Sequence, residues 1–199
     1  MAADESRLAA ANAAAMEILR SFYPEETPLR TLLLKHSTQV RDKALDLLRR
    51  GPDPAICDEA DVVQAALLHD IGVGRCHAPS ILCEGTADYM AHGLIGGQML
   101  REYAISHHLD LEKYARVCER HTGTGLTAED IRMQRLPLPE RDFLPETPLE
   151  RLVCLADKFY SKSGAMQEKP LARVRQEMAR FGEATLRRLD AMLALFGTG

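Results

Sequence analysis

Apolar residues recur at helical spacing along almost the whole sequence, and this periodicity constrains the fold more than any other feature. Runs in which β-branched residues alternate with polar ones, as in half-buried strands, are absent. The sequence therefore predicts an all-α fold, a helical bundle. The chain has 199 residues, of which 46% are hydrophobic, so it can bury a sizeable core. We expect a single domain over residues 1–199.

Capping and helix-breaking residues divide this pattern into separate helices. The predicted helices cover about 5–23, 28–51, 58–70, 88–103, 110–121, 127–135 and 149–163. Residues 169–197 are predicted to form one long amphipathic helix, or two helices broken near Gly182. Thr127 and Asp130 have the spacing of a capping box. Residues 71–87 are predicted to be a long loop, which in a compact domain is usually functional or mobile.

Charge and cysteine content exclude several classes of protein. A net charge of -4 provides no basic surface for a nucleic-acid polymer or an anionic membrane. The N-terminus lacks the basic and apolar parts of a signal peptide, and no apolar run approaches the ~20 residues of a membrane span. The five cysteines are scattered, and Cys76, His77 and Cys83 lack the tight spacing of a structural zinc site. We therefore expect a cytoplasmic protein without structural zinc.

A histidine and an aspartate stand side by side in the stretch ALLHDIGVGR, at the end of an apolar helix. Neighbouring helical residues point ~100° apart, but beyond a helix end both side chains can turn toward one point. A buried carboxylate costs several kcal/mol unless a cation or donors compensate it, as estimated for buried ions. A metal ion would compensate Asp70 and would also use the imidazole of His69.

Other histidines and a second aspartate lie in similar apolar surroundings. His36 follows a run of leucines, His92 opens a helix whose glycines permit close packing, and His121 ends a helix before the sequence TGTG. Asp157 interrupts the apolar segment LVCLADKFY. Each of these residues taken alone is compatible with a hydrogen-bonded core residue or a helix cap. Together they are hard to explain by packing, and they predict a metal site.

In this order, the residues resemble the motifs of the HD-domain superfamily of metal-dependent phosphohydrolases, in its HDIG subgroup. The resemblance extends from about Leu29 to Ser163 and includes the HSxxV context of His36 and the ADK context of Asp157. It implies an HD-domain helical bundle with its core at about 29–163, and with the N-terminal and C-terminal helices packed on that core. The GYP motif of the diguanylate-cleaving branch is absent.

The resemblance also implies the role of each metal ligand. One ion would be held by His36, His69, Asp70 and Asp157, and a second by His92 and His121, with Asp70 bridging the two. Imidazole and carboxylate ligands suit iron, manganese or zinc. Two such ions about 3.5–4 Å apart activate a shared water and clamp a phosphoryl group. His69 and Asp70 are therefore the expected catalytic residues, with divalent metal as the cofactor.

The expected function is hydrolysis of a phosphate ester of a small metabolite or nucleotide. Arg75, in the glycine-containing loop, and Lys158, beside Asp157, are candidates to bind its phosphate, although both are equally compatible with a surface position. Two alternatives remain open at this point. A few HD-fold proteins are di-iron oxygenases, and a metal can also be retained in a sensor or binding module without catalysis. The sequence does not identify the substrate or the oligomeric state.

Overall fold

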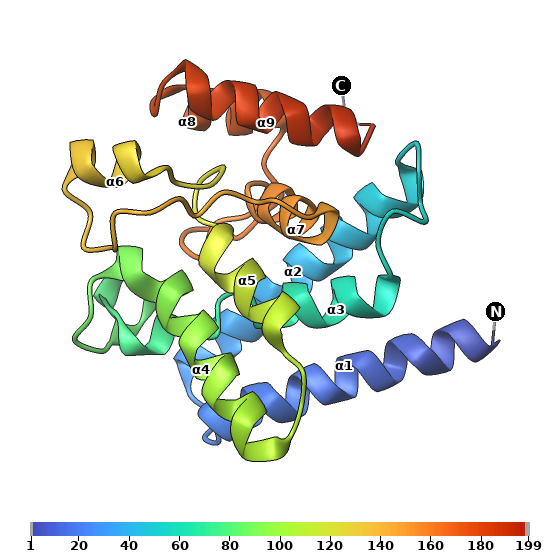
Figure 1. Cartoon of the computed structure of the whole chain (residues 1–199). Coiled ribbons are helices and arrows are strands. Elements are labelled where there is room, and N and C mark those ends of the chain that lie inside the picture. Colours follow the sequence, from blue (N-terminus) through green and yellow to red (C-terminus); the bar gives the residue numbers. More distant parts are fainter. Residues whose placement is uncertain (1, 198–199) are drawn as a thin grey trace.

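The computed structural model describes residues 2–197 and is helical over most of them, as predicted (Figure 1). The helices along these residues are α1 (Ala2–Phe22), α2 (Pro28–Arg50), α3 (Glu59–Leu68), α4 (His92–His107), α5 (Glu112–Arg120), α6 (Ala128–Gln134), α7 (Pro148–Asp157), α8 (Leu171–Ala179) and α9 (Glu183–Leu195). Nowhere in this described part of the chain is a helix both long enough and apolar enough to cross a bilayer.

Local capping chemistry explains several helix boundaries. Thr27 accepts a hydrogen bond from the Arg30 backbone N–H at 3.1 Å, and Pro28 occupies the first turn of α2. The predicted capping box of α6 is present, with Thr127 and Asp130 each accepting a backbone N–H of the other. These bonds satisfy donors that a helix N-terminus leaves unpaired, so both helices begin where the sequence predicts.

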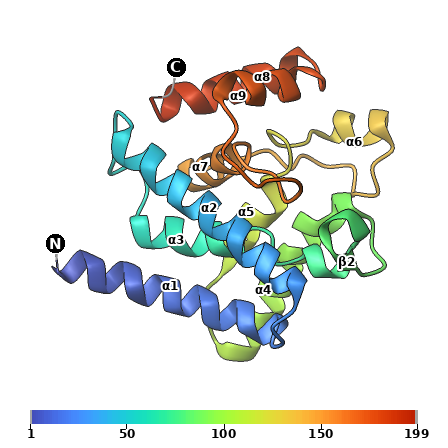
Figure 2. The same ribbon diagram turned by 180° about the vertical axis from the view of Figure 1, so that it is seen from behind.

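Helix α3 lies at the centre of the molecule and contacts α1, α2, α5 and α7 (Figures 1 and 2). Its side chains from Val62 to Leu68 are mostly buried, because neighbouring helices cover it on several sides. Helices α4 and α5 pack against each other, and α9 packs on α7 at the opposite end of the molecule from α1. The main core includes buried residues from both terminal helices, among them Ala15, Ile18, Leu189 and Phe196.

Residues 71–91 differ from the predicted loop because they contain short ordered elements. These are the 3₁₀ helices η1 (Val73–Arg75), η2 (Pro79–Ile81) and η3 (Tyr89–Ala91), and the antiparallel strands β1 (His77–Ala78) and β2 (Cys83–Glu84). Strands of two residues are too short to show alternation in the sequence. Ile81 and Cys83 are buried against Leu33 of α2 and Leu19 of α1, so this segment is anchored to the helices.

The cysteines of this segment behave as buried core residues. Cys76 and Cys83 are both fully buried, and burial raises the pKa of the Cys76 thiol to about 11. His77 is exposed. Among residues 2–197, the groups of side chains suited to hold a metal include none of these three residues. Cys76 and Cys83 therefore pack as core side chains, and His77 lies on the surface.

The predicted helix over 149–163 is wrong in its second half, because α7 ends at Asp157. The Lys158 backbone N–H bonds to Leu155 three residues earlier, which tightens the last turn, and the chain then continues without helix to α8. Ser161, Ser163 and Gly164 are weak helix formers, and Gly164 has a φ of 72°. At the C-terminus the two-helix alternative is the observed one, with the break at Gly182, whose φ is 94°.

Candidate metal centre

The adjacent His69 and Asp70 lie just beyond the last turn of α3, in the interior of the molecule. Helix α3 ends at Leu68, and both of the following side chains have no solvent exposure. Backbone bonds from Ile71 to Leu68 and from Val73 to Asp70 turn the chain at this point. The buried helix therefore delivers the imidazole and the carboxylate side by side to the same point, as the sequence predicts.

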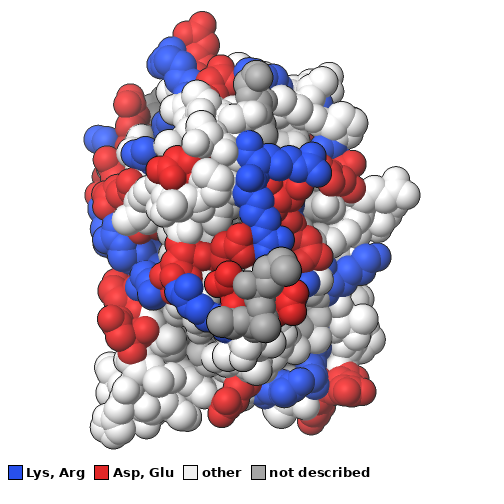
Figure 3. Space-filling view, turned by 90° about the vertical axis from the view of Figure 1, so that its right-hand side faces the viewer, with Lys and Arg blue, Asp and Glu red and all other residues white. Residues whose placement is uncertain are grey.

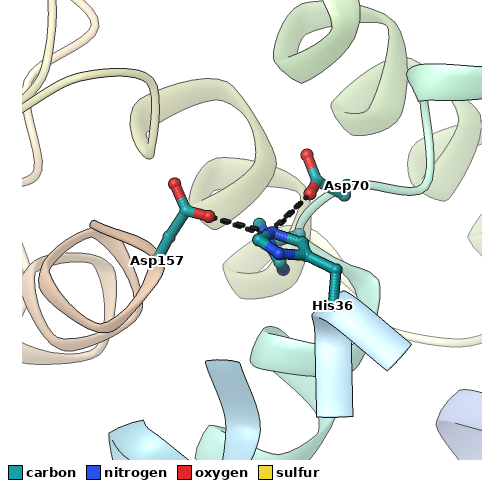
Figure 4. Close-up of side chains that lie close together, drawn as sticks. His36, Asp70 and Asp157 are labelled. Carbon is teal, nitrogen blue, oxygen red and sulfur yellow. Dashed lines mark hydrogen bonds and ion pairs between the residues drawn. The ribbon is translucent and has the colours of Figure 1, made fainter. Parts of the chain in front are cut away.

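His36 of α2 and Asp157 of α7 meet this pair from two other helices. Figure 4 shows His36 between the carboxylates of Asp70 and Asp157. The Nε2 atom of His36 lies 3.0 Å from Asp157 Oδ1 and 3.2 Å from Asp70 Oδ2. The Nε2 atom of His69 lies 3.0 Å from Asp70 Oδ2 and 3.6 Å from Asp157 Oδ1. The four side chains thus direct one ligand atom each into a single small volume.

A second group forms on the other oxygen of Asp70. His92, the first residue of α4, and His121, at the end of α5, place their Nε2 atoms 3.5 Å and 3.4 Å from Asp70 Oδ1. These two Nε2 atoms are 3.0 Å apart. Asp70 is therefore shared by two adjacent His/Asp groups, one on each carboxylate oxygen. This arrangement suggests a dinuclear metal site. We call the six residues of the two groups the metal centre.

Backbone carbonyls fix the orientation of three of the imidazoles. The Nδ1 atoms of His69, His92 and His121 lie 2.7, 2.6 and 2.7 Å from carbonyl oxygens three residues earlier in the chain. A carbonyl can only accept, so each Nδ1 must carry the proton and donate. In the neutral form of each ring, Nε2 then has its lone pair facing the metal centre. Metal-binding histidines commonly have this type of second hydrogen bond.

The unpaired atoms of the metal centre fit a bound cation. Within the described residues His69 Nε2 and Asp70 Oδ1 are buried without a hydrogen-bond partner, and Asp70 Oδ2 forms an ion pair with the Lys162 ammonium. The facing Nε2 atoms of His92 and His121 each carry a lone pair, and two lone pairs at 3.0 Å repel each other. Buried polar atoms of this kind are costly unless something satisfies them. Imidazole nitrogens and carboxylate oxygens suit iron, manganese or zinc, so the donor set fits the predicted metals.

The electrostatics of the two groups differ. Burial disfavours the charged form of His69, but the carboxylates of Asp70 and Asp157 outweigh burial and raise its pKa to about 9. Burial opposes ionisation of Asp70 and Asp157 too, yet neighbouring histidines and lysines hold both pKa values well below the usual range. His92 is different, because burial dominates and lowers its pKa to about 3. The first group thus contains both carboxylates, whereas the second adds imidazoles whose protonation is disfavoured by burial.

The structure adds Lys162 to the residues found from the sequence. Its Nζ lies 2.6 Å from Asp70 Oδ2, although the two residues are 92 positions apart. The side chain is 10% exposed and approaches the ring of Tyr89, which stacks on His92. Sequence reasoning placed Lys162 on a helix that ends five residues earlier, and so missed it. The only local signal is a basic residue within the short polar stretch SKSG.

The two basic residues predicted from the sequence occupy different positions. Lys158 is buried, with its Nζ 2.8 Å from Asp157 Oδ2 and donating to the His121 carbonyl at 3.1 Å. It therefore contacts both groups of the metal centre. Arg75 ends η1 and is exposed, and its side chain does not line the cavity that opens onto the metal centre. The role of both residues toward a substrate stays a prediction.

A cavity of about 320 Å³ opens onto the metal centre, and we call it the entrance cavity. Two of the proposed ligands form part of its wall. The remaining lining is largely polar. The full lining is His36, Ala78, Ser80, Ile81, Tyr89, Asp157, Tyr160, Ser161, Lys162 and Ser163. Its hydroxyl groups and its ammonium group are suited to bind an anionic oxygen-rich group beside the metal centre.

Known proteins are similar to this chain over much of its length. The family model described as HD domain matches residues 33–161, which is most of the chain. An uncharacterized protein of Methanocaldococcus jannaschii is 31% identical over 146 residues, which make up 73% of this chain and 72% of that protein. No solved structure matches the chain.

Two further relatives are named tRNA (cytidine(56)-2'-O)-methyltransferase. The protein from Picrophilus torridus is 31% identical over 70% of this chain, and the one from Thermoplasma volcanium is 27% identical over 65%. The matched regions are 35% and 32% of those proteins, so the chain spans about a third of their length. The match of the family model and the geometry of the metal centre agree, and the chain belongs to the HD domain family.

Proposed function

We propose that the protein is a metal-dependent phosphohydrolase that cleaves a phosphate ester of a small metabolite or nucleotide. The observation that carries this proposal is the shared carboxylate of Asp70, with histidine Nε2 atoms gathered on both of its oxygens. One carboxylate between two ligand groups is how paired metal ions are held close together. His36, His69 and Asp157 would complete one ion's ligands, and His92 and His121 would complete the other's.

The chemistry of this centre favours hydrolysis. Two divalent ions held by these residues would lower the pKa of a bound water and neutralise charge on a phosphoryl group. Asp70 would contribute a ligand to each ion, and His69, whose ring is oriented by the Ala66 carbonyl, would contribute a ligand to one of them. Lys162 reaches the centre from the entrance cavity and would contact a phosphoryl oxygen. Lys158, beside Asp157, and Arg75, in the exposed loop, would also bind the substrate phosphate.

The size of the entrance cavity and the charge of the chain support a small substrate rather than a polymer. The entrance cavity is about 320 Å³, which is near the lower end of the usual range for small-molecule sites. Acidic and basic side chains are intermingled on the face drawn in Figure 3, and the net charge is -4. We therefore propose neither a nucleic-acid polymer nor a membrane as a partner. The cysteines are free thiols, which supports the proposed cytoplasmic location.

The proposal is tested by metal analysis and a substrate screen on one preparation. Protein purified without added metal is assayed for bound ions, then for hydrolysis of phosphomonoesters, phosphodiesters, nucleotides and tRNA with manganese, iron or cobalt. We expect metal-dependent release of phosphate from a small ester without oxygen uptake, and no activity in Asp70→Asn.

Three results would overturn the proposal. Substrate loss coupled to oxygen uptake, with no ester cleaved, would favour the di-iron oxygenase. Full metal occupancy with no turnover of any substrate would favour a sensor or binding module. Cleavage confined to tRNA would show that the substrate is not small.

A further inference from the structure

A second cavity, of about 290 Å³, lies on another side of the metal centre. Its lining comes from the chain around Thr122–Leu126 after α5, from α6 and the residue Leu136 beyond it, and from the C-terminal pair α8 and α9. We call it the C-terminal cavity. Helices α8 and α9 lie outside residues 33–161, the region matched by the HD domain model. One wall of this cavity is therefore added to the HD domain by this chain's own C-terminal helices.

The C-terminal cavity adjoins the metal centre through Lys158. This side chain lines the cavity and also touches Asp157 Oδ2 at 2.8 Å and the carbonyl of His121 at 3.1 Å. Thr122, another lining residue, directly follows His121. The residues that follow His121 and Asp157 in the chain, Thr122 and Lys158, thus lie in the cavity wall. Lys158 therefore stands between the metal centre and this cavity.

Most of the C-terminal cavity is apolar, which distinguishes it from the entrance cavity. Met90, Leu126, Leu136 and Met178 are partly exposed side chains of its wall. Phe181 also lines it and is 59% exposed, which is unusual for a large aromatic side chain. These side chains would lose further contact with water if an apolar group filled the cavity.

The polar groups of the cavity are concentrated at Arg188 of α9. Its guanidinium donates to Thr124 Oγ1 at 3.2 Å and to the Gly125 carbonyl at 3.3 Å, and it pairs with Asp130 Oδ2 at 3.4 Å. These contacts are long for hydrogen bonds to a guanidinium, so its N–H groups can still serve a better placed acceptor. Lys158 supplies a second cation on the side of the metal centre. A ligand with an apolar body, a hydrogen-bond acceptor and an anionic end would complement this distribution.

We propose that the C-terminal cavity binds the organic group of the substrate, and that this group is compact, largely apolar and aromatic, with an acceptor for Arg188. The inference rests on the proposed function for the position of the phosphate. It makes α8 and α9 the determinants of substrate choice, while the HD domain supplies the metal centre. The preferred substrates are then aromatic phosphate esters rather than esters of small polar alcohols.

The kinetic test compares 1-naphthyl phosphate with glycerol phosphate. We expect a lower KM for the naphthyl ester, and we expect Phe181→Ala and Met178→Ala to raise that KM about tenfold, as for loss of apolar contact in a specificity pocket. Neither variant should change the KM for glycerol phosphate more than about twofold, because glycerol has no apolar group that could contact these side chains. Met133→Ala is the matched control, since Met133 is 77% exposed on α6 but does not line the cavity. Equal KM values for both esters, unchanged in the variants, would overturn the proposal.

A binding measurement separates this inference from the hydrolase proposal. The probe is 1-naphthylmethylphosphonate, which cannot be hydrolysed as an ester, titrated into metal-loaded protein and followed by calorimetry. If the probe binds, and if Phe181→Ala but not Met133→Ala weakens its affinity about tenfold, the cavity assignment holds even if no ester is cleaved. If esters are cleaved but the probe binds all three proteins equally, the cavity assignment fails and the hydrolase stands.

Discussion

Asp70 connects the two halves of the metal centre, because its two carboxylate oxygens face different histidines. Asp70→Ala removes a ligand from both groups and should strip most of the metal and abolish activity. His92→Ala or His121→Ala removes one neutral donor from one group, and should leave about one ion per chain with greatly reduced activity. Metal analysis of variants shown to be folded by circular dichroism checks this. Wild-type metal content and rate in both histidine variants would exclude the second ion.

Lys162 is expected to act on the substrate rather than on the metal. Burial lowers its pKa, but Asp70 and Asp157 outweigh burial and raise it, so the side chain is a permanent cation at the entrance cavity. Lys162→Met should leave the metal content unchanged and raise the KM for a phosphate ester about tenfold to a hundredfold, as for one charge-assisted hydrogen bond. Lys162→Arg should recover part of the loss.

The control for this prediction is Lys43→Met. The Lys43 ammonium pairs with Glu168 at 2.6 Å and does not line the entrance cavity. Its replacement should leave KM unchanged. If Lys162→Met instead lost its metal as Asp70→Ala does, or kept wild-type KM, Lys162 would have no role toward the substrate.

Close packing of helix α4 on helix α5 brings the two histidines of the second group together. A Cβ added at Gly93 would lie 2.4 Å from the Cys118 carbonyl oxygen, the same oxygen that accepts from His121 Nδ1. Gly93→Ala should therefore turn His121 away, remove the second ion and cost about 1–3 kcal/mol of unfolding free energy, as other overpacked sites do. Gly96→Ala is the milder comparison, since its nearest contact would be 3.2 Å. Equal metal loss in both variants would contradict this account.

Arg101 joins α4 to α5 from the outside of the same contact. It donates to both Glu112 oxygens at 2.8 Å and to Glu119, which is almost fully buried, at 2.6 Å. Arg101→Met should cost about 1–3 kcal/mol near neutral pH, because Glu119 loses its closest cation while Arg101 itself is partly screened by water. Denaturant unfolding of both proteins checks the value.

This interaction also has a definite pH dependence. The hydrogen bond from Arg101 lowers the pKa of Glu112 below its ordinary value of 4.5. A lowered carboxyl pKa stabilises the fold above pH 4.5, and that contribution disappears as the pH falls through the folded-state value. The difference in unfolding free energy between the wild type and Arg101→Met should thus become smaller below pH 4.5. A gap that widened in acid would assign the stabilisation to another group.

The sequence predicts those elements whose signals are local. The starts of α2 and α6 follow from Thr27 with Pro28 and from the capping box of Thr127, because caps act within one turn. The hairpin of β1 and β2 was not predicted, because strands of two residues show no alternation. The early end of α7 was missed, although Ser161, Ser163 and Gly164 are weak helix formers. The six residues of the metal centre were recognisable as a series of motifs, whereas Lys162 reaches Asp70 only through the non-helical path of residues 158–169.

At the scale of the whole molecule, the metal centre gathers side chains from α2, α4 and α7 and from the ends of α3 and α5. A ligand that binds only the folded state stabilises it by mass action, by about 2.7 kcal/mol at a hundred times its dissociation constant. Chelation should therefore lower the melting temperature, and added manganese should restore it. The melting temperature of Asp70→Ala should respond to neither treatment. A response equal to that of the wild type would place the stabilising metal elsewhere.

His36 and Asp157 lie 121 positions apart in the chain, yet their side chains are 3.0 Å apart. When the first hundred residues of this sequence have been translated, His36 and His69 are present but Asp157 has not yet been made. The complete first group can therefore assemble only after residue 157 has left the ribosomal tunnel and α7 has docked. Incorporation of metal becomes a late step of biogenesis, and an incompletely synthesised chain has no finished centre with which to compete for the cell's metal ions.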